Sequence, residues 1–460
     1  MKTIARTFAH ISVTENKPDE TSGFERFIYY YVIFLLVIIF STSSSLLLKT
    51  DLFYVYLGGA QNPLVFLLAI WLTWKALKKF RTFPHSEADR SLLLIVLLTV
   101  ISLLFSSNPV EVTNAGFPQN VEGSLEYFII TLLFIGFFYL TLDTMRRREN
   151  LVHILYIILS TGFIVVTFNI YYLVNNEFCT FGILERYPFW TGKIPLGFYN
   201  SFLICFFLGF LFYRWRSPSK LINMLIWLLL VGAGVSLFFS FSRGSWITLI
   251  LILILVGIMK LGRYFFYSLL IIALVFTMVF PDIVGDVSLA VYNINSGNVD
   301  DRIYIWKSAL DMIRDHPLVG VGPGTFNVNY LNRYQLVESS RWNASYHAHN
   351  VFLHVAAEQG YLGLGAFLMF WGIVFRRLIL NFRLNNRSDD FLKGFSCGIL
   401  FCFINYFLWS LTNTSLGSTT RSFFNINMII WFFAALTFII PKIIETTTPV
   451  EKAGVDGTIP

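Results

Sequence analysis

A short polar segment carries side chains that could move a proton. His347 and His349 are separated by one residue, and Asn350 follows them at the start of a long apolar run. A histidine with an unperturbed pKa of about 6.5 can accept a proton at neutral pH. On a continuous helix His349 would share a face with Phe352 and Gly360, in the first turn and facing inward. The residues alone leave two interpretations of His349 open: a general base, or a polar residue that only caps the helix.

A third histidine, His354, raises the question of a metal site. It lies five residues after His349, about 140° around a helix, so the two side chains should point to different faces. The spacing of His347, His349 and His354 fits no standard zinc pattern, and no cysteine accompanies them. We expect no metal here.

Two arginines could bind an anion. Arg243 stands in a short turn between two apolar runs, and Arg302 opens a stretch in which Trp306 and Ile313 fall at helical spacing. This stretch predicts an amphipathic helix at the membrane surface. A guanidinium matches two phosphate oxygens at once. The alternatives are that Arg243 extends to the membrane interface and that Arg302 pairs with the preceding aspartates.

A glycine-rich segment, Gly320–Gly324, follows Pro317 and resembles a phosphate-binding loop only superficially. It lacks the lysine and hydroxyl pair of such loops and follows no strand. We predict that this segment is a break between helices.

The elements that hold these residues must be membrane helices. Of the 460 residues, 56% are hydrophobic and 13% are charged, whereas soluble domains carry about 25% charged residues. This composition excludes a soluble enzyme, a disordered chain and a disulfide-linked secreted domain. The net charge of +7 does not indicate nucleic acid, because the apolar content outweighs it.

The apolar stretches predict an all-α polytopic membrane protein with about twelve transmembrane helices, since one span needs ~20 residues. The stretches are 27–48, 62–78, 91–106, 124–142, 151–174, 196–213, 221–241, 245–259, 264–281, 361–380, 392–411 and 422–441.

Basic residues gather in alternate loops, which stay on the cytoplasmic side. The prediction is a cytoplasmic tail (1–26), helices one to nine (27–281), a large outer loop with amphipathic helices (282–360), helices ten to twelve (361–441) and a cytoplasmic tail (442–460). Loops longer than ~15 residues are usually functional, so we expect the active site in the large loop.

Four motifs resemble one known family. The spacing from His349-Asn350 to Gly360 and Gly363 is similar to the signature of bacterial O-antigen ligases, in the O-antigen ligase/polymerase superfamily. Ser242–Gly244, Asp301–Trp306 and Pro317–Gly322 resemble further motifs in the family's order, and the resemblance covers about residues 230–380. One departure is Tyr199, which stands where the family's Gly-x-Pro-Asn stretch has proline.

The resemblance implies a GT-C-like membrane glycosyltransferase of the bacterial inner membrane. The reaction would be an inverting, metal-independent transfer of polysaccharide from undecaprenyl pyrophosphate to a lipid A–core sugar hydroxyl on the periplasmic side, without a cofactor or nucleic acid. Arg243 and Arg302 would hold the pyrophosphate, and His349 would be the base. The remaining implied site residues share a supporting role: His347, Asn350 and Arg421.

Other functions stay open from the sequence. A polymerase of the same superfamily would use the same site on a lipid-linked glycan, and a third relative would glycosylate a protein hydroxyl. A transporter is the alternative from a different class. Transporters usually place ionisable residues inside their spans, whereas the predicted spans here are nearly free of charge.

Overall fold

The computed structural model describes residues 23–41, 61–105, 119–175, 193–215, 217, 219–240, 242–262, 264, 267, 298–336, 347–384, 390–414 and 424–447. All regular elements in these ranges are helical. Nine of the described helices are long and apolar enough to cross a membrane, which confirms the predicted all-α polytopic membrane fold. These nine are α2 (Gly23–Ser41), α6 (Gln119–Thr144), α7 (Arg148–Asn175), α8 (Lys193–Phe212), α9 (Lys220–Phe239), α10 (Arg243–Leu261), α15 (Val351–Leu384), α16 (Asp390–Trp409) and α17 (Phe424–Thr447).

The shorter described helices complete the architecture. Two of them, α4 (Gln61–Leu77) and α5 (Asp89–Phe105), have 17 residues each and coincide with predicted spans. The others are α13 (Asn298–Asp315), α14 (Phe326–Asn329) and the π-helical turn η3 (Tyr330–Tyr334). All but one of the predicted spans overlap a described helix; the exception, 264–281, lies outside the described residues apart from positions 264 and 267.

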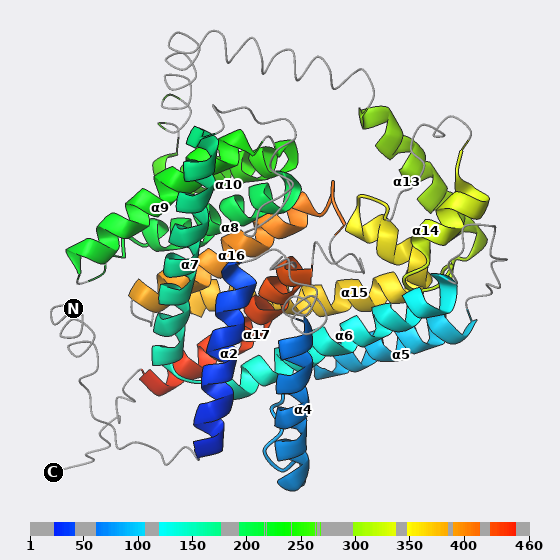
Figure 1. The fold of residues 1–460 in the computed structure, drawn as a ribbon, viewed down its shortest axis with the longest axis horizontal. Helices are drawn as coiled ribbons and strands as arrows, with labels where there is room; N and C mark the ends of the chain where they lie inside the picture. The colour runs from blue at the N-terminus through cyan, green and yellow to red at the C-terminus, as the bar shows by residue number, and fades with distance from the viewer. Residues whose placement is uncertain are drawn as a thin grey trace, which may run out of the picture.

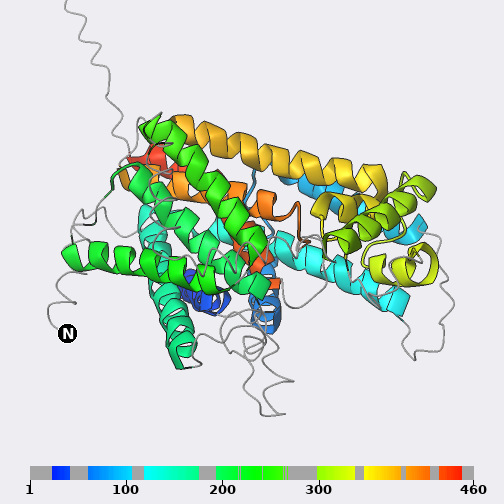
Figure 2. The same cartoon turned by 90° about the horizontal axis from the view of Figure 1, so that it is seen from above.

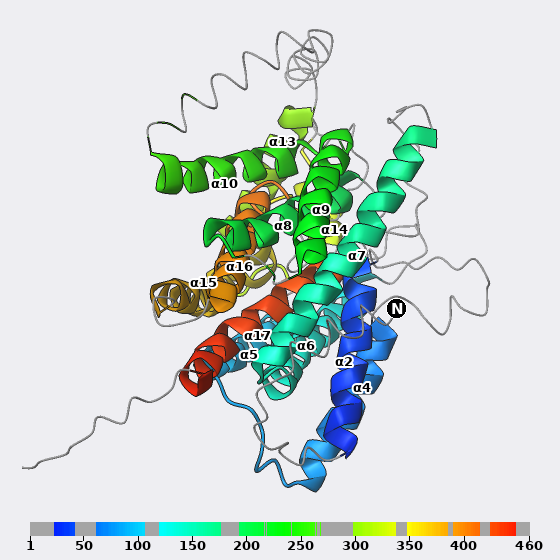
Figure 3. The same ribbon diagram turned by 90° about the vertical axis from the view of Figure 1, so that its left-hand side faces the viewer.

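Helix α17 forms the centre of the bundle. It contacts α6, α15, α16 and α2, and Figure 3 shows it between α15 and α16 on one side and α6 and α2 on the other. The Trp431 ring of α17 stacks on Phe370 of α15 at 4.9 Å and on Phe134 of α6 at 6.2 Å between centroids. Offset aromatic pairs of this kind add to the gain from burial.

Helices α8 and α16 approach through glycines. A β-carbon on Gly209 would lie 2.1 Å from the backbone nitrogen of Gly398, so the two backbones meet without intervening side chains. Small residues at such contacts are typical of helices that pack within a membrane.

Helices α13 and α14 lie at one end of the bundle (Figure 1). Figures 1 and 2 show α5, α6 and α15 alongside one another, with α13 and α14 at the same end of these three helices. The predicted helix after Arg302 is present as α13. Its buried face includes Ile305, Ala309 and Met312, whereas Ile303 and Leu310 are exposed. The helix therefore packs on other parts of the protein, and only part of its apolar surface is left for a membrane.

Helix α15 is interrupted at Gly360, whose φ of 67° and ψ of −171° are not helical. Its second part contains the predicted span 361–380. Its first part begins at Val351 and belongs to the predicted outer loop, so one element links that loop directly to the bundle.

Candidate active site

The interruption in α15 is filled by the loop formed by residues 317–322. In a continuous helix the Tyr361 amide would donate to the Ala357 carbonyl. Instead, Tyr361 donates to the Pro317 carbonyl at 2.7 Å, and the Ala357 carbonyl accepts from Val321 at 2.9 Å. The loop therefore inserts into the hydrogen-bond ladder of the helix.

The next pair of backbone groups is exchanged in the same way. The Leu362 amide donates to the Leu318 carbonyl at 3.4 Å, and the Glu358 carbonyl accepts from Gly322 at 2.9 Å. Backbone groups freed by a helix break must find other partners inside a membrane protein, and the loop supplies them. We call this paired arrangement of 317–322 and 357–362 the backbone seam.

Two glycines permit the seam. Gly320 and Gly360 have φ values of 72° and 67°, a region that side chains rarely adopt. A β-carbon on Gly320 would lie 2.3 Å from the Glu358 carbonyl carbon, and one on Gly360 would lie 2.3 Å from the Leu318 carbonyl carbon. The two separate glycine motifs of the sequence are therefore one structural unit.

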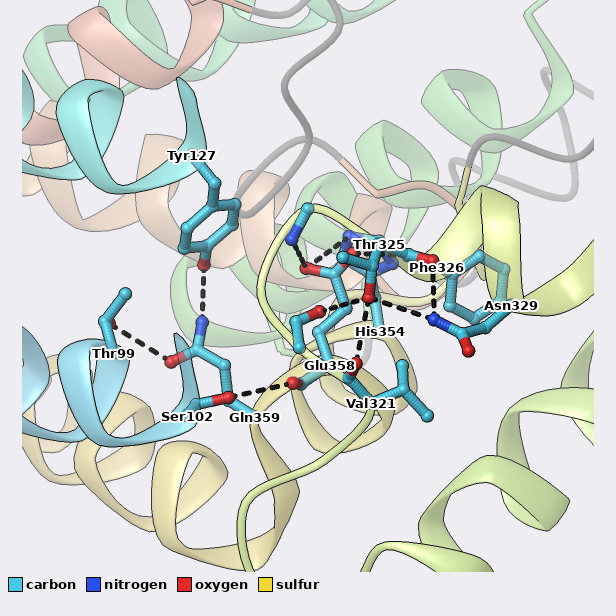
Figure 4. Close-up of polar contacts among 12 residues, drawn as sticks. Thr99, Ser102, Tyr127, Val321, Thr325, Phe326, Asn329, His354, Glu358 and Gln359 are labelled. Carbon is cyan, nitrogen blue, oxygen red and sulfur yellow. Dashed lines mark hydrogen bonds and ion pairs between the residues drawn. The ribbon is translucent and has the colours of Figure 1, made fainter. Parts of the chain in front are cut away.

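The buried side chain of Glu358 extends the seam to the next part of the loop. Its carboxylate accepts hydrogen bonds from the amides of Gly324, at 2.9 Å, and Phe326, at 3.0 Å. His354 is also buried, and its Nε2 lies 3.7 Å from Glu358 Oε2. Figure 4 shows the carboxylate enclosed by this part of the loop. These two hydrogen bonds hold the loop beside α15.

Gln359 points the opposite way and ties α15 to the first half of the chain. It donates to the Tyr127 hydroxyl of α6 at 2.7 Å and accepts from Thr99 of α5 at 3.3 Å. One turn further along α5, Ser102 donates to the Val319 carbonyl at 2.6 Å. Helices α5 and α6, which lie outside the motifs singled out in the sequence, therefore support the seam.

The structure corrects the predicted position of His349. The residue precedes α15 with a left-handed φ of 51°, so it does not lie in the first helical turn. Asn350 caps the helix instead, because its Oδ1 accepts from the amides of Phe352 and Leu353 at 3.0 and 3.1 Å. The Asn350 amide also donates to the Leu411 carbonyl at 3.2 Å, which anchors the turn to the end of α16.

The histidine rings form a cluster. The centroids of His347 and His349 are 4.3 Å apart. Burial, with further contributions from His347, Arg302 and His354, lowers the pKa of His349 to about 3. Burial and the neighbouring charges of His354 and Arg302 lower the pKa of His347 to about 4. Both imidazoles are therefore neutral at pH 7.

The expectation that His354 and His349 point to different faces rested on helical spacing. It assumed one continuous helix, whereas His349 lies in the preceding turn, and His354 is close enough for its charge to lower the pKa of both other histidines. Across the described ranges, no group of three or more His, Cys, Asp or Glu side chains is placed to hold a metal ion.

Arg302 is close enough to this cluster for its charge to lower the pKa of His347 and His349, and Arg243 is close enough to Arg302 to lower its pKa. Arg302 belongs to α13, and the indole of Trp306 on the same helix donates to the Ala348 carbonyl at 2.9 Å, between the two histidines. Arg243 is the first residue of α10. Burial lowers the pKa of Arg302, and the positive charge of Arg243 lowers it further. The chain therefore brings together two like charges and the neutral His349.

The segment after α16 links the turn at Arg243 to the turn at His349. A β-carbon on Gly244 would lie 3.3 Å from the Thr412 hydroxyl, and the Val351 amide donates to the Ser410 carbonyl at 3.0 Å. Arg421 lies outside the described residues.

The stretch that contains Tyr199 packs against the turn that precedes Arg243. A β-carbon on Gly197 would lie 2.2 Å from the β-carbon of Ser242. Tyr199 is fully buried, and Asn200 donates to Ser236 of α9 at 2.9 Å. The departure from the family's proline therefore lies in a packed helix interior beside the site.

The fold and site together define a polytopic helical membrane protein whose polar residues converge at a broken helix. Residues 228–368 match the family model of O-antigen ligase, and this match supports the O-antigen ligase/polymerase superfamily. It includes Arg243, Arg302, His349 and the whole backbone seam. No curated protein matches the chain.

Proposed function

We propose that this protein is an O-antigen ligase of the inner membrane, with both termini cytoplasmic and the site periplasmic. It transfers polysaccharide from undecaprenyl pyrophosphate to a sugar hydroxyl of lipid A–core. The observation that carries the proposal is the pair Arg243 and Arg302 beside the neutral His349. Two adjacent like charges repel each other, and a bound pyrophosphate would offset this repulsion.

The proposed reaction is one displacement at the anomeric carbon of the donor glycan. The acceptor hydroxyl oxygen forms the new C–O bond, and the bond to pyrophosphate breaks and leaves its electron pair on the pyrophosphate. His349 takes the hydroxyl proton. Arg243 and Arg302 stabilise the negative charge that develops on the leaving group, and attack from the opposite face inverts the anomeric configuration.

The low pKa of His349 supports an order of binding. At a pKa of about 3 the imidazole is a weak base, and general bases work best with a pKa near the operating pH. The negative charge of a nearby pyrophosphate favours the protonated imidazole and so raises this pKa. Donor binding would therefore prepare His349 to accept the proton.

Three side-chain contacts beside the seam would keep these groups in position. Glu358 holds residues 324–326, the Trp306 indole joins α13 to Ala348, and Asn350 fixes the turn that carries His349. Holding reactants and catalytic groups in the reactive geometry can contribute several kcal/mol to lowering a barrier. His347 would contribute to the same turn by packing against His349.

Purified protein in nanodiscs tests the proposal. With undecaprenyl-pyrophosphate polysaccharide and lipid A–core, and with no nucleotide sugar, we expect glycosylated lipid A–core as a ladder on a gel. Growth of the lipid-linked polymer without lipid A–core would identify a polymerase of the same superfamily and reject the ligase proposal. A requirement for nucleotide sugar would reject both.

A further inference from the structure

A cavity lies at the other end of the helices that support the seam. Near the start of α6, Tyr127 contacts Gln359, whereas Asp143 in the last turn of α6 lines this cavity. The cavity has a volume of about 730 Å³, which is in the range of pockets that bind small ligands, about 300–1,000 Å³. It lies between the start of α2, the end of α4 and the junction of α6 and α7.

The lining of the cavity is basic. Four of its side chains are positively charged and two are negatively charged: Arg26, Lys75, Arg146 and Arg147, and Glu25 and Asp143. Both acidic groups already contact cations. Asp143 lies 2.7 Å from Lys75 and also pairs with Arg146, and Glu25 lies 3.4 Å from Lys78. An anion in the cavity would therefore meet excess positive charge.

Aromatic side chains surround the same cavity. Tyr29, Tyr30 and Trp74 contribute to its lining, and the Lys78 ammonium lies 4.4 Å from the centre of the Trp74 ring. Tyrosine and tryptophan with nearby basic residues are typical of the headgroup level of a membrane. The cavity therefore has the composition of a site at a membrane surface.

An exposed apolar stripe leads away from the cavity along α2. Phe27, Tyr30, Phe34 and Val37 are 50%, 68%, 54% and 39% exposed. Their spacing of three and four residues places them on one face of the helix. Tyr30 belongs to both the cavity lining and the stripe, so a molecule with its polar end in the cavity could lay an apolar chain along α2.

We propose that this cavity binds the phosphate headgroup of an anionic phospholipid, with an acyl chain along the α2 stripe. Arginine guanidinium groups match phosphate oxygens, and basic pockets between transmembrane helices bind anionic headgroups. The stripe distinguishes the lipid from free phosphate, because only the lipid gains from apolar contact. The site is separate from the proposed donor site and does not depend on the ligase reaction.

Lipid binding to the intact purified protein tests this proposal, with phosphatidylglycerol as the anionic probe and phosphatidylethanolamine, which is zwitterionic and has no net charge, as the comparison. We expect the wild-type protein to prefer phosphatidylglycerol. The double variant Arg26→Gln/Arg147→Gln should lose about fivefold in affinity for each arginine, since one basic residue near an anionic membrane contributes about 1 kcal/mol.

Arg148→Gln is the matched control. Arg148 follows Arg147 directly but is not part of the cavity lining, and its guanidinium lies 5.1 Å from the centre of the Phe391 ring. This variant should bind phosphatidylglycerol as the wild type does. Arg147→Gln alone provides a milder test if the double variant does not fold.

Three results would overturn the proposal. The first is equal affinity for the two lipids. The second is an equal loss of affinity for phosphatidylglycerol in Arg148→Gln and in the double variant. The third is binding of inorganic phosphate as strong as that of phosphatidylglycerol at the same concentration. The last result would identify a phosphate site without a lipid. All these measurements are of binding, so a failure of glycan transfer would not affect them.

Discussion

The guanidinium of Arg302 lies near that of Arg243, close enough that the charge of Arg243 lowers the pKa of Arg302. Arg243 is the first residue of α10 and Arg302 lies near the start of α13, so the two residues belong to different helices that are far apart in sequence. Such a pair is costly without an anion and favourable with one. The first prediction follows from this relationship.

Replacing Arg302 by glutamine should lower the rate of glycan transfer by about 10²–10³-fold, the usual effect of losing one group that stabilises developing negative charge. Arg302→Lys should keep part of the activity, because lysine retains the positive charge but cannot bind two phosphate oxygens at once as a guanidinium does. The comparison is Arg314→Gln at the other end of α13, which removes an exposed ion pair with Asp311 at 2.9 Å. Equal activity of Arg302→Gln and Arg314→Gln would contradict the proposed role.

His349→Asn should lower transfer by about 10²–10⁴-fold, the range for a lost general base. Asparagine tolerates the left-handed φ of 51° better than most residues, so this variant removes the base and keeps the turn. Donor binding should persist, and it can be measured with labelled undecaprenyl pyrophosphate. His316→Asn, at the end of α13, serves as the control; an active His349→Asn protein would exclude His349 as the base.

Acid should destabilise the folded protein through the two histidines. Burial first, and neighbouring charges next, hold the pKa of His347 at about 4 and of His349 at about 3 when the protein is folded. The unfolded values are about 6.5, so the unfolded chain binds more protons below that pH. The contribution of these two histidines to stability is therefore fully present above about pH 6.5 and is lost as the pH drops toward 4.

The measurement is the thermal unfolding midpoint in detergent as a function of pH. The double variant His347→Asn/His349→Asn should show a smaller decrease between pH 6.5 and 4 than the wild type. If the two curves are parallel over this range, other groups cause the acid sensitivity.

Gly360→Ala should prevent the backbone seam from forming. The added β-carbon would lie 2.3 Å from the Leu318 carbonyl carbon, at a φ of 67°. Gly365→Ala, on the same helix, meets nothing within 4 Å and should be neutral or slightly stabilising. Gly360→Ala should have a lower unfolding midpoint and a lower transfer rate than Gly365→Ala. If the two variants are indistinguishable, the result argues against the seam.

Glu358→Gln should lower the free energy of unfolding by about 1–3 kcal/mol, the cost of leaving a buried group without its partner. A glutamine side chain has one oxygen, whereas Glu358 accepts from Gly324 and Phe326 on two different oxygens. The substitution therefore leaves one of the two amides without its acceptor. Glu87→Gln removes exposed pairs with Arg376 and Arg377 and should change stability by less than ~1 kcal/mol. Thermal unfolding of the three proteins gives the comparison.

Much of the fold was predictable, because long apolar runs have few structural options in a membrane. The residues of the candidate site were also predictable, for a different reason. Arg243, Arg302 and His349 stand out as polar residues in or beside apolar sequence, and the structure brings them together. Their proposed roles stay predictions.

The supporting contacts were not predictable from local pattern. Gln359 and Tyr127 are 232 residues apart in sequence, and nothing in the apolar sequence of α6 marks Tyr127 as a partner. Glu358 did carry a signal: a carboxylate inside an apolar run must be paired or hydrogen-bonded. The backbone conformation of His349 depends on Asn350 and the end of α16, so helical periodicity alone placed it in the wrong turn.

The backbone seam has a consequence for sequence change. Its four exchanged hydrogen bonds use only main-chain amides and carbonyls, which every residue except proline provides in full. Leu318, Val321 and Tyr361 can therefore be replaced without removing the hydrogen bonds themselves, whereas Gly320 and Gly360 cannot. A protein can diverge widely around such a joint and still be recognised from a few well-spaced glycines.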